Sequence, residues 1–196
     1  MTLGAILLAG GRGSRVDGAV KPLFDIGGQT LLGAAVTAVT DAGARTIVVA
    51  GPDLVPDLDV TWVREDPPFG GPAAGTVAAL GAIHDPEWVF LLACDLPAVG
   101  AAVATLSAAL PLLPSDAAGV CLGDRSSRPQ WLIGLYRTAA LRQAASTLPE
   151  KGAGASMRDL LAELAITVLA TDDSRTRDVD TWEDLAQARR THEEQR

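Results

Sequence analysis

The sequence is poor in several residue types, and each shortage excludes a class of protein. Its 16 lysines and arginines are outnumbered by 24 aspartates and glutamates, which gives a net charge of −8. Duplex nucleic acid and anionic membranes both require a basic face, so we expect neither as a partner. No apolar run reaches the roughly 20 residues of a membrane-spanning helix, and no charged leader precedes the first apolar segment. We therefore expect a cytoplasmic protein.

Cysteine and histidine are scarce too, with two residues of each type. Cys94 and Cys121 end apolar runs and lack the spacing of metal ligands, so we expect buried free thiols. His84 precedes Asp-Pro at the end of an expected helix, and His192 lies near the C-terminus. We expect both histidines to be exposed, and the chain therefore offers no convincing Ser-His-Asp set.

Aromatic residues make up only 4% of a chain that is 48% hydrophobic. Its core must therefore consist mainly of small aliphatic side chains, which allow close packing between helices and a sheet. A length of 196 residues fits one domain, spanning residues 1–196. The chain predicts an α/β fold of Rossmann-like type, because short apolar runs alternate with helical patterns.

The expected strands and helices follow from these patterns. The strands are residues 3–9, 46–50, 60–64, 89–93, 116–122, 130–136 and 166–170, and the helices are residues 30–42, 72–83, 100–110, 138–147, 156–164 and 181–190. The first strand, helix and second strand make a βαβ unit, whose right-handed crossover implies a parallel pair. Loops that follow such strands lie at the carboxyl edge of the sheet, where open α/β folds bind ligands.

A glycine-rich loop follows the first strand. Gly10, Gly11 and Gly13 would let backbone N–H groups approach an anion, and Arg15 and Lys21 supply positive charge beside them. Lys21 is one of two lysines in a chain that otherwise uses arginine. The loop is not a Walker motif, and it lacks the third glycine of a dinucleotide fingerprint. The pattern therefore favours a phosphate-binding loop over a simple tight turn.

Carboxylates occur at two further places that the fold brings toward this edge. Asp95 follows the buried strand 89–93, and it could ligate Mg²⁺ or serve only as a turn residue before Pro97. Asp178 and Asp180 alternate along an extended segment, so they share one side, and either could complete a metal site. Asp180 could instead only precede the cap of the last helix. Together with the glycine loop, these residues indicate phosphoryl-type chemistry.

Six motifs occur in one order along nearly the whole chain. They are Leu8-Ala9-Gly10-Gly11-Arg12-Gly13-Ser14-Arg15, Lys21-Pro22-Leu23, Gly71-Pro72-Ala73-Ala74-Gly75, Cys94-Asp95-Leu96-Pro97, Arg128-Pro129 and Asp178-Val179-Asp180-Thr181. In order and approximate spacing they resemble the molybdenum cofactor guanylyltransferases. The resemblance implies a Rossmann-like three-layer α/β/α nucleotidyltransferase fold, with a mostly parallel sheet that contains an antiparallel strand.

The resemblance also implies a reaction. In that family, the terminal phosphate of molybdopterin attacks the α-phosphate of GTP with Mg²⁺ present, and the products are the guanine dinucleotide cofactor and pyrophosphate. The small residues on the expected surface helices would allow a monomer or weak homodimer, and we name molybdoenzyme maturation proteins as candidate partners.

Site residues can be carried over position by position. The resemblance implies catalytic roles for Arg15, Lys21 and Asp95, and metal binding by Asp95 and Asp180. The residues that it implies for nucleotide binding are Leu8, Ala9, Gly10, Gly11, Gly13, Lys21, Asp66 and Gly71.

The chain departs from the family pattern at three places. Val20 replaces an acid before the lysine, Val16 replaces a methionine, and Asp178 and Asp180 replace asparagines in a chain that contains no asparagine. Two alternatives therefore stay open: a sister enzyme that uses CTP or another nucleotide with a different phosphorylated acceptor, or a non-catalytic nucleotide-binding protein. An NAD-binding oxidoreductase is disfavoured, because the glycine fingerprint is incomplete.

Overall fold

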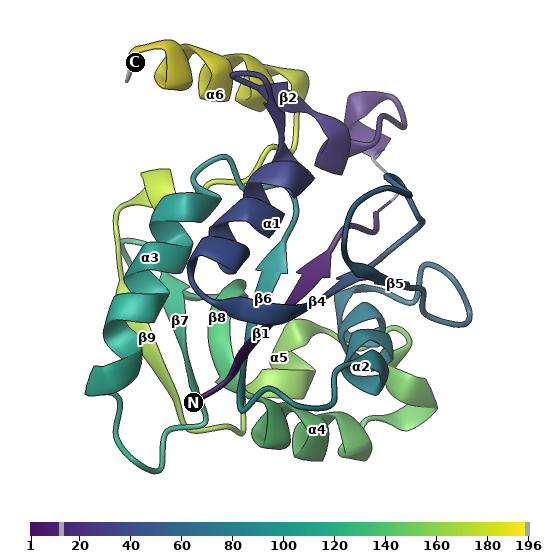
Figure 1. The fold of residues 1–196 in the computed structure, drawn as a ribbon, viewed down its shortest axis with the longest axis vertical. Helices are drawn as coiled ribbons and strands as arrows, with labels where there is room; N and C mark the ends of the chain where they lie inside the picture. The colour runs from purple at the N-terminus through teal and green to yellow at the C-terminus, as the bar shows by residue number, and fades with distance from the viewer. Residues whose placement is uncertain (12–13, 195–196) are drawn as a thin grey trace.

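A computed structural model describes residues 1–11 and 14–194 of the chain. A seven-stranded sheet has the order β5-β4-β1-β6-β8-β7-β9, and a separate hairpin pairs β2 with β3 (Figure 1). The strands are β1 Leu3–Leu8, β2 Asp25–Ile26, β3 Gln29–Thr30, β4 Ala44–Ala50, β5 Thr61–Val63, β6 Trp88–Ala93, β7 Gly119–Gly123, β8 Pro129–Arg137 and β9 Ile166–Ala170. The α-helices are α1 Leu31–Asp41, α2 Pro72–Ala82, α3 Val99–Ala109, α4 Thr138–Thr147, α5 Met157–Leu161 and α6 Trp182–Glu194.

The sheet is mostly parallel, as expected. Strands β5, β4, β1 and β6 run parallel to one another, and β7 and β9 form a second parallel pair. Strand β8 is inserted between β6 and β7 and runs antiparallel to both. The prediction of a parallel sheet with one antiparallel strand is therefore confirmed.

Helices cover both faces of the sheet (Figure 1). Side chains of β1 and β6 alternate between the faces, so Leu7 and Phe90 pack with α1 and α3, whereas Ile6 and Leu91 pack with α2, α4 and α5. The side chains in both layers are mainly alanine, valine and leucine, as the composition predicts. Cys94 and Cys121 are buried free thiols, which confirms that prediction.

The hairpin and the last helix form a small third cluster. Val16, Phe24, Leu31, Val179 and Leu185 are buried against one another there. The hairpin was not predicted, because two-residue strands are too short to show a period; the glycine pair at 27 and 28 was the available signal. Helix α6 has the expected capping box, in which Thr181 and Asp184 bond each other's backbone N–H.

Three element boundaries differ from the prediction by three residues or more. Strand β7 begins at Gly119 rather than at residue 116, because the preceding segment forms a turn in which Ala117 N–H donates to Pro114 O. Helix α5 ends at Leu161, three residues before the expected end, and α6 continues to Glu194. Among the described residues, none of the helices combines the length and apolar character that a bilayer crossing requires.

Gly134 shows how tightly the sheet is packed on β8. Residues 134 and 136 lie on the same side of the strand, and the Tyr136 side chain lies over Gly134 with its hydroxyl donating to Trp131 O at 2.8 Å. A Cβ at Gly134 would overlap the tyrosine ring. Tyr136 is fully buried, so the ring has no free space to move into.

We expect Gly134→Ala to lower the free energy of unfolding by about 1–3 kcal/mol, because overpacking displaces buried side chains. Urea unfolding measures the change. Gly81→Ala is the matched control: this glycine lies in α2, and its added Cβ meets nothing within 4 Å. An alanine there should stabilise the protein by about 0.4–1 kcal/mol. Equal stabilities of the two variants would contradict this view of the packing.

Candidate active site

The site lies where β1 and β6 end side by side. Leu8 and Ala93 are register partners at the carboxyl ends of these parallel strands, and Cys94 N–H donates to Leu8 O at 3.0 Å. The glycine loop leaves β1 at this point, and Asp95 follows β6. Parallel pairing therefore brings two sequence motifs, more than 80 residues apart, to one edge of the sheet.

Lys21 reaches this edge from a short 3₁₀ turn, Lys21–Leu23, in which Pro22 is buried and fixes the start of the turn. Its Nζ lies 2.5 Å from Asp180 Oδ1 and 3.8 Å from Asp95 Oδ2. The Lys21 side chain is only 17% exposed, whereas that of Arg15, which also pairs with Asp180, is 70% exposed. Lys21 is thus fixed inside the site, and Arg15 lies at its solvent edge.

The segment from Asp178 to Asp180 is attached directly to Asp95. Val179 N–H donates to Asp95 O at 2.9 Å, and the Val179 side chain is fully buried in the third cluster. Alternation along this extended segment places Asp178 and Asp180 on the opposite side from Val179, as the sequence predicted. The backbone N–H of Asp180 also approaches Asp184 Oδ2 at 3.3 Å, so the start of α6 holds the segment in place.

Asp95, Asp178 and Asp180 form a cluster of three carboxylates. One oxygen from each lies within 4.8 Å of the others. Burial raises the pKa of Asp95 to about 6, with a further contribution from the negative charge of Asp178, while Lys21 acts in the opposite direction. A hydrogen bond from Lys21 lowers the pKa of Asp180. The sequence had left open which aspartate would join Asp95, and the structure brings both to it.

The donor set fits a divalent cation of the hard type. Such ions prefer carboxylate oxygens, and three carboxylates within a few ångströms of one another repel unless positive charge lies between them. Lys21 supplies one such charge within the cluster and Arg15 another at its edge, while the pKa of Asp95 is raised mainly by burial and further by the negative charge of Asp178.

Three cavities meet at Asp95. The first, of about 510 Å³, is lined by Leu8, Gly10, Gly11, Ala50, Gly51, Pro52, Arg64, Glu65, Phe69, Gly71, Pro72, Gly75, Ala93, Asp95 and Leu132. The second, of about 300 Å³, lies over the glycine loop and is lined by residues that include Ala9, Arg15, Lys21 and Asp180. The third, of about 1360 Å³, extends along β8 and α5. A bound molecule in one cavity can therefore reach a group in another at Asp95.

The structure places most of the sequence-predicted site residues in these cavities. Leu8, Gly10, Gly11 and Gly71 line the first, and Ala9 lines the second. Asp66 does not line the first cavity; it is exposed and lines a neighbouring one of about 530 Å³. Gly13 lies outside the described residues.

Sequence reasoning missed several lining residues. Arg64, Glu65 and Phe69 line the first cavity, and Trp131 and Arg158 line the third. Glu65 and Arg64 were detectable as polar residues that directly follow a strand. Arg158 gave no such signal, because it lies within an amphipathic helix. Neither histidine lines these cavities: His84 is exposed as expected, but His192 is half-buried over Gly27.

The buried charge of Asp95 predicts a pH effect on stability. With a chelator present, we expect Asp95→Asn to be at least as stable as the wild type at pH 7.5, and the difference to shrink at pH 5. The folded protein raises the pKa of Asp95 from 3.8 to about 6, so it retains a proton between these values that the unfolded chain has lost. Ionisation of Asp95 therefore destabilises the folded protein above pH 6. Below pH 3.8 Asp95 is protonated in both the folded and the unfolded chain, and this destabilisation is absent.

Urea unfolding at both pH values measures this difference. A wild type more stable than Asp95→Asn at pH 7.5 would show that Lys21 compensates fully for burial, contrary to this expectation.

A glycine loop, a fixed lysine and clustered carboxylates at the carboxyl edge of a mostly parallel sheet define a Rossmann-like nucleotidyltransferase fold. Residues 5–170 match the family model described as "MobA-like NTP transferase domain", and the chain belongs to this family. It is therefore a nucleotidyltransferase, as the sequence predicted. Nucleotidyltransferases of this family typically use a divalent metal.

Similar known proteins support the family assignment or the fold. A probable molybdenum cofactor guanylyltransferase of Synechococcus elongatus is 34% identical over 152 residues, which cover 71% of this chain and 74% of the relative. A nucleotidyl transferase from Methanothermobacter superposes with a TM-score of 0.73 at 19% identity, over 100% of this chain and 99% of that one. The 2-C-methyl-D-erythritol 4-phosphate cytidylyltransferase of Thermus thermophilus gives 0.68 at 17% identity, over 98% and 100%. The last two establish the fold alone.

Proposed function

We propose that this protein transfers GMP from GTP to the terminal phosphate of molybdopterin and releases pyrophosphate, with Mg²⁺ as its cofactor. The observation that carries the proposal is the convergence of Lys21, Arg15 and three carboxylates at the point where the three cavities meet. The guanylyltransferase relative supports the choice of substrates.

The first cavity would hold the nucleoside. Its lining is largely glycine backbone and apolar side chain, and Glu65 supplies a carboxylate whose Oε1 accepts a hydrogen bond from Phe69 N–H at 2.9 Å. Guanine presents N–H donors that a carboxylate can accept, so Glu65 is the candidate base reader there. Gly71 has φ 95°, a backbone conformation that side chains disfavour, so the close approach at this loop requires glycine. Asp66, in the adjacent cavity that Arg64 and Glu65 also line, would lie near the nucleotide.

The second cavity would hold the triphosphate. Backbone N–H groups of Gly10, Gly11 and Gly13 would cradle its oxygens, and Arg15 can form bidentate contacts from the solvent edge. Lys21 lies deeper and would neutralise charge as it gathers on the departing pyrophosphate. Mg²⁺ held by Asp95 and Asp180, with Asp178 beside them, would supply electrostatic stabilisation of the reacting phosphate.

The third cavity would hold the acceptor. Arg128 and Arg158 line it and can bind a phosphate, and Trp131 can stack on a planar pterin ring. Asp95 lines both this cavity and the first, so the acceptor phosphate and the α-phosphate of the nucleotide would meet beside it. In-line displacement would then require the pyrophosphate to leave on the side away from the acceptor.

We take residues 1–196 as one nucleotidyltransferase domain that works in the cytoplasm as a monomer or weak homodimer. Molybdoenzyme maturation proteins would receive its product.

A thermal-shift panel of GTP, CTP, ATP, UTP and NAD, each with and without Mg²⁺, tests the nucleotide assignment. A ligand that binds only the folded protein raises its unfolding temperature by mass action. We expect a Mg²⁺-dependent shift that is largest with GTP. A larger shift with CTP would favour a sister cytidylyltransferase. No shift with any nucleotide would contradict the proposal that this site binds a nucleoside triphosphate.

A further inference from the structure

Asp180 differs from Asp95 and Asp178 in its contacts, because a basic side chain donates to each of its two carboxylate oxygens. Lys21 donates to Oδ1 at 2.5 Å, and Arg15 donates to Oδ2. These two residues are also the cations that line the cavity over the glycine loop. Asp180 therefore binds the same groups that an incoming triphosphate would need.

The same carboxylate belongs to the cluster that fits a divalent cation. Its oxygen lies within 4.8 Å of oxygens from Asp95 and Asp178, so only a side-chain adjustment separates the two roles. The backbone cannot readily move, because Val179 is anchored to Asp95 and the start of α6 holds Thr181. While Lys21 and Arg15 are paired with Asp180, however, their two positive charges lie beside any cation that binds to the cluster. The two roles of Asp180 therefore oppose each other.

We propose that Asp180 couples nucleotide binding to cation binding, by acting as the anionic partner of Lys21 and Arg15 until a triphosphate replaces it. This inference rests on the proposed function in one respect, namely that a polyphosphate binds over the glycine loop. Once the triphosphate pairs with both basic side chains, Asp180 is released and is free to serve as a cation ligand with Asp95 and Asp178.

The consequence is a reciprocal coupling. A nucleotide without a divalent cation must displace an aspartate from two ion pairs, and a cation without a nucleotide must bind beside two positive charges. When both bind, each removes the obstacle to the other, so each raises the affinity for the other by the same factor. Binding of a metal-free nucleotide is thereby disfavoured.

Asp178 provides the matched control within the same cluster. It carries the same charge and also lies within 4.8 Å of Asp95. It is exposed, and in the part of the chain that the structure describes it forms no ion pair with Arg15 or Lys21. Removing its charge therefore tests general repulsion of phosphate, whereas removing that of Asp180 tests the release of two basic side chains.

Isothermal titration calorimetry on the full chain, with GTP and separately with inorganic tripolyphosphate, tests the proposal. Each ligand is titrated with EDTA and with Mn²⁺, into the wild type, Asp180→Asn and Asp178→Asn. We expect Asp180→Asn to bind both ligands about tenfold more tightly than the wild type in EDTA, within the usual range of coupling between sites. Asp178→Asn should gain less than about threefold, as expected for removal of an exposed charge that, among the described residues, pairs with neither Lys21 nor Arg15.

The factor by which Mn²⁺ strengthens binding should be smaller in Asp180→Asn than in the wild type. Equal affinities of the two variants in EDTA, or an unchanged Mn²⁺ factor in Asp180→Asn, would overturn the proposal. Binding of tripolyphosphate but not of GTP would instead refute the guanine assignment, and the tripolyphosphate series would still decide the role of Asp180. A wild type that binds neither ligand would refute both.

Discussion

Asp95→Asn is expected to lower kcat by at least about 10²–10³-fold, the effect typical of removing one preorganised electrostatic contact to a reacting group. Asp95 lies at the point where the three cavities meet and contributes one oxygen to the carboxylate cluster. Asparagine keeps the shape of the side chain but removes the charge that a divalent cation requires. Pyrophosphate release measures the change.

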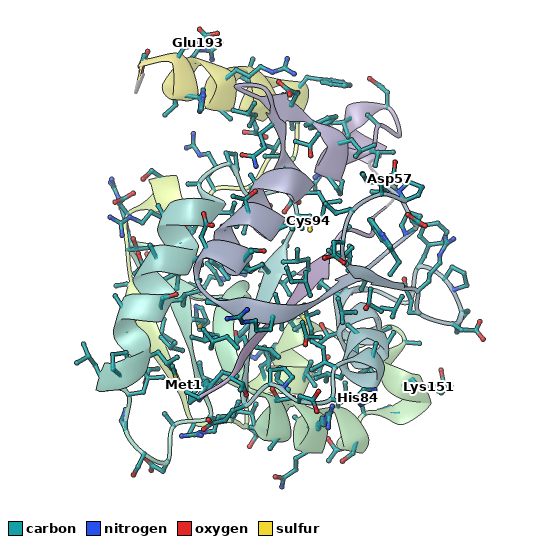
Figure 2. All side chains as sticks on the ribbon, viewed as in Figure 1. Met1, Asp57, His84, Cys94, Lys151 and Glu193 are labelled. Carbon is teal, nitrogen blue, oxygen red and sulfur yellow. The ribbon has the colours of Figure 1, made fainter. Side chains whose placement is uncertain are left out.

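The control for this variant is Asp57→Asn. Asp57 is exposed on the loop before β5, away from the centre of the molecule (Figure 2), and does not line the three cavities that meet at Asp95. We expect that variant to keep wild-type turnover. Because Asp95→Asn should be at least as stable as the metal-free wild type at pH 7.5, a loss of activity cannot be attributed to unfolding. Turnover within a few-fold of wild type in Asp95→Asn would refute the role of Asp95 in the reaction.

Lys21→Ala should reduce kcat/KM by about 10²-fold or more, because charge on the departing pyrophosphate would lose its nearest fixed cation. Its Nζ lies between Asp180 at 2.5 Å and Asp95 at 3.8 Å, so the positive charge is held at the centre of the site. Lys21→Arg should restore the activity only in part. A planar guanidinium with fixed donors cannot reproduce the contacts of a compact ammonium group on a flexible stem.

The chain provides a direct control for Lys21, because it contains one other lysine. Lys151 is exposed, lies far from Cys94 in Figure 2, and lines the cavity that contains Asp66 rather than the three that meet at Asp95. Lys151→Ala should leave kcat/KM unchanged. Equal losses in the two lysine variants would show that net charge, rather than the position of Lys21, determines the effect.

The parallel sheet was predictable because its signals are local. Buried parallel strands are continuous apolar runs, and β1 and β6 show this in sequence, so their limits came out within one residue of the prediction. The βαβ rule then placed the glycine loop and Asp95 at one edge before any coordinates were used. Helix α6 was recognisable from its capping box. Short hairpin strands such as β2 and β3 carry no comparable periodic signal.

The site was less predictable where it depends on contacts between residues that are far apart in the sequence. Alternation placed Asp178 and Asp180 on one side, but nothing local showed that both would lie near Asp95, because that depends on the hydrogen bond from Val179 N–H to Asp95 O. The ion pairs of Asp180 with Lys21 and Arg15 join residues about 160 positions apart. Likewise, only the path of the loop after β5 decides that Glu65 rather than Asp66 lines the first cavity. Family motifs identify positions, and tertiary packing decides which neighbour faces the ligand.

Direct synthesis of the dinucleotide tests the central claim. The purified protein would be incubated with molybdopterin, GTP and Mg²⁺, and the guanine dinucleotide and pyrophosphate would be quantified together. We expect both products in equal amounts, with neither formed by Asp95→Asn above the background. The absence of both products, under conditions in which a known guanylyltransferase forms them, would contradict guanylyl transfer as the function of this protein.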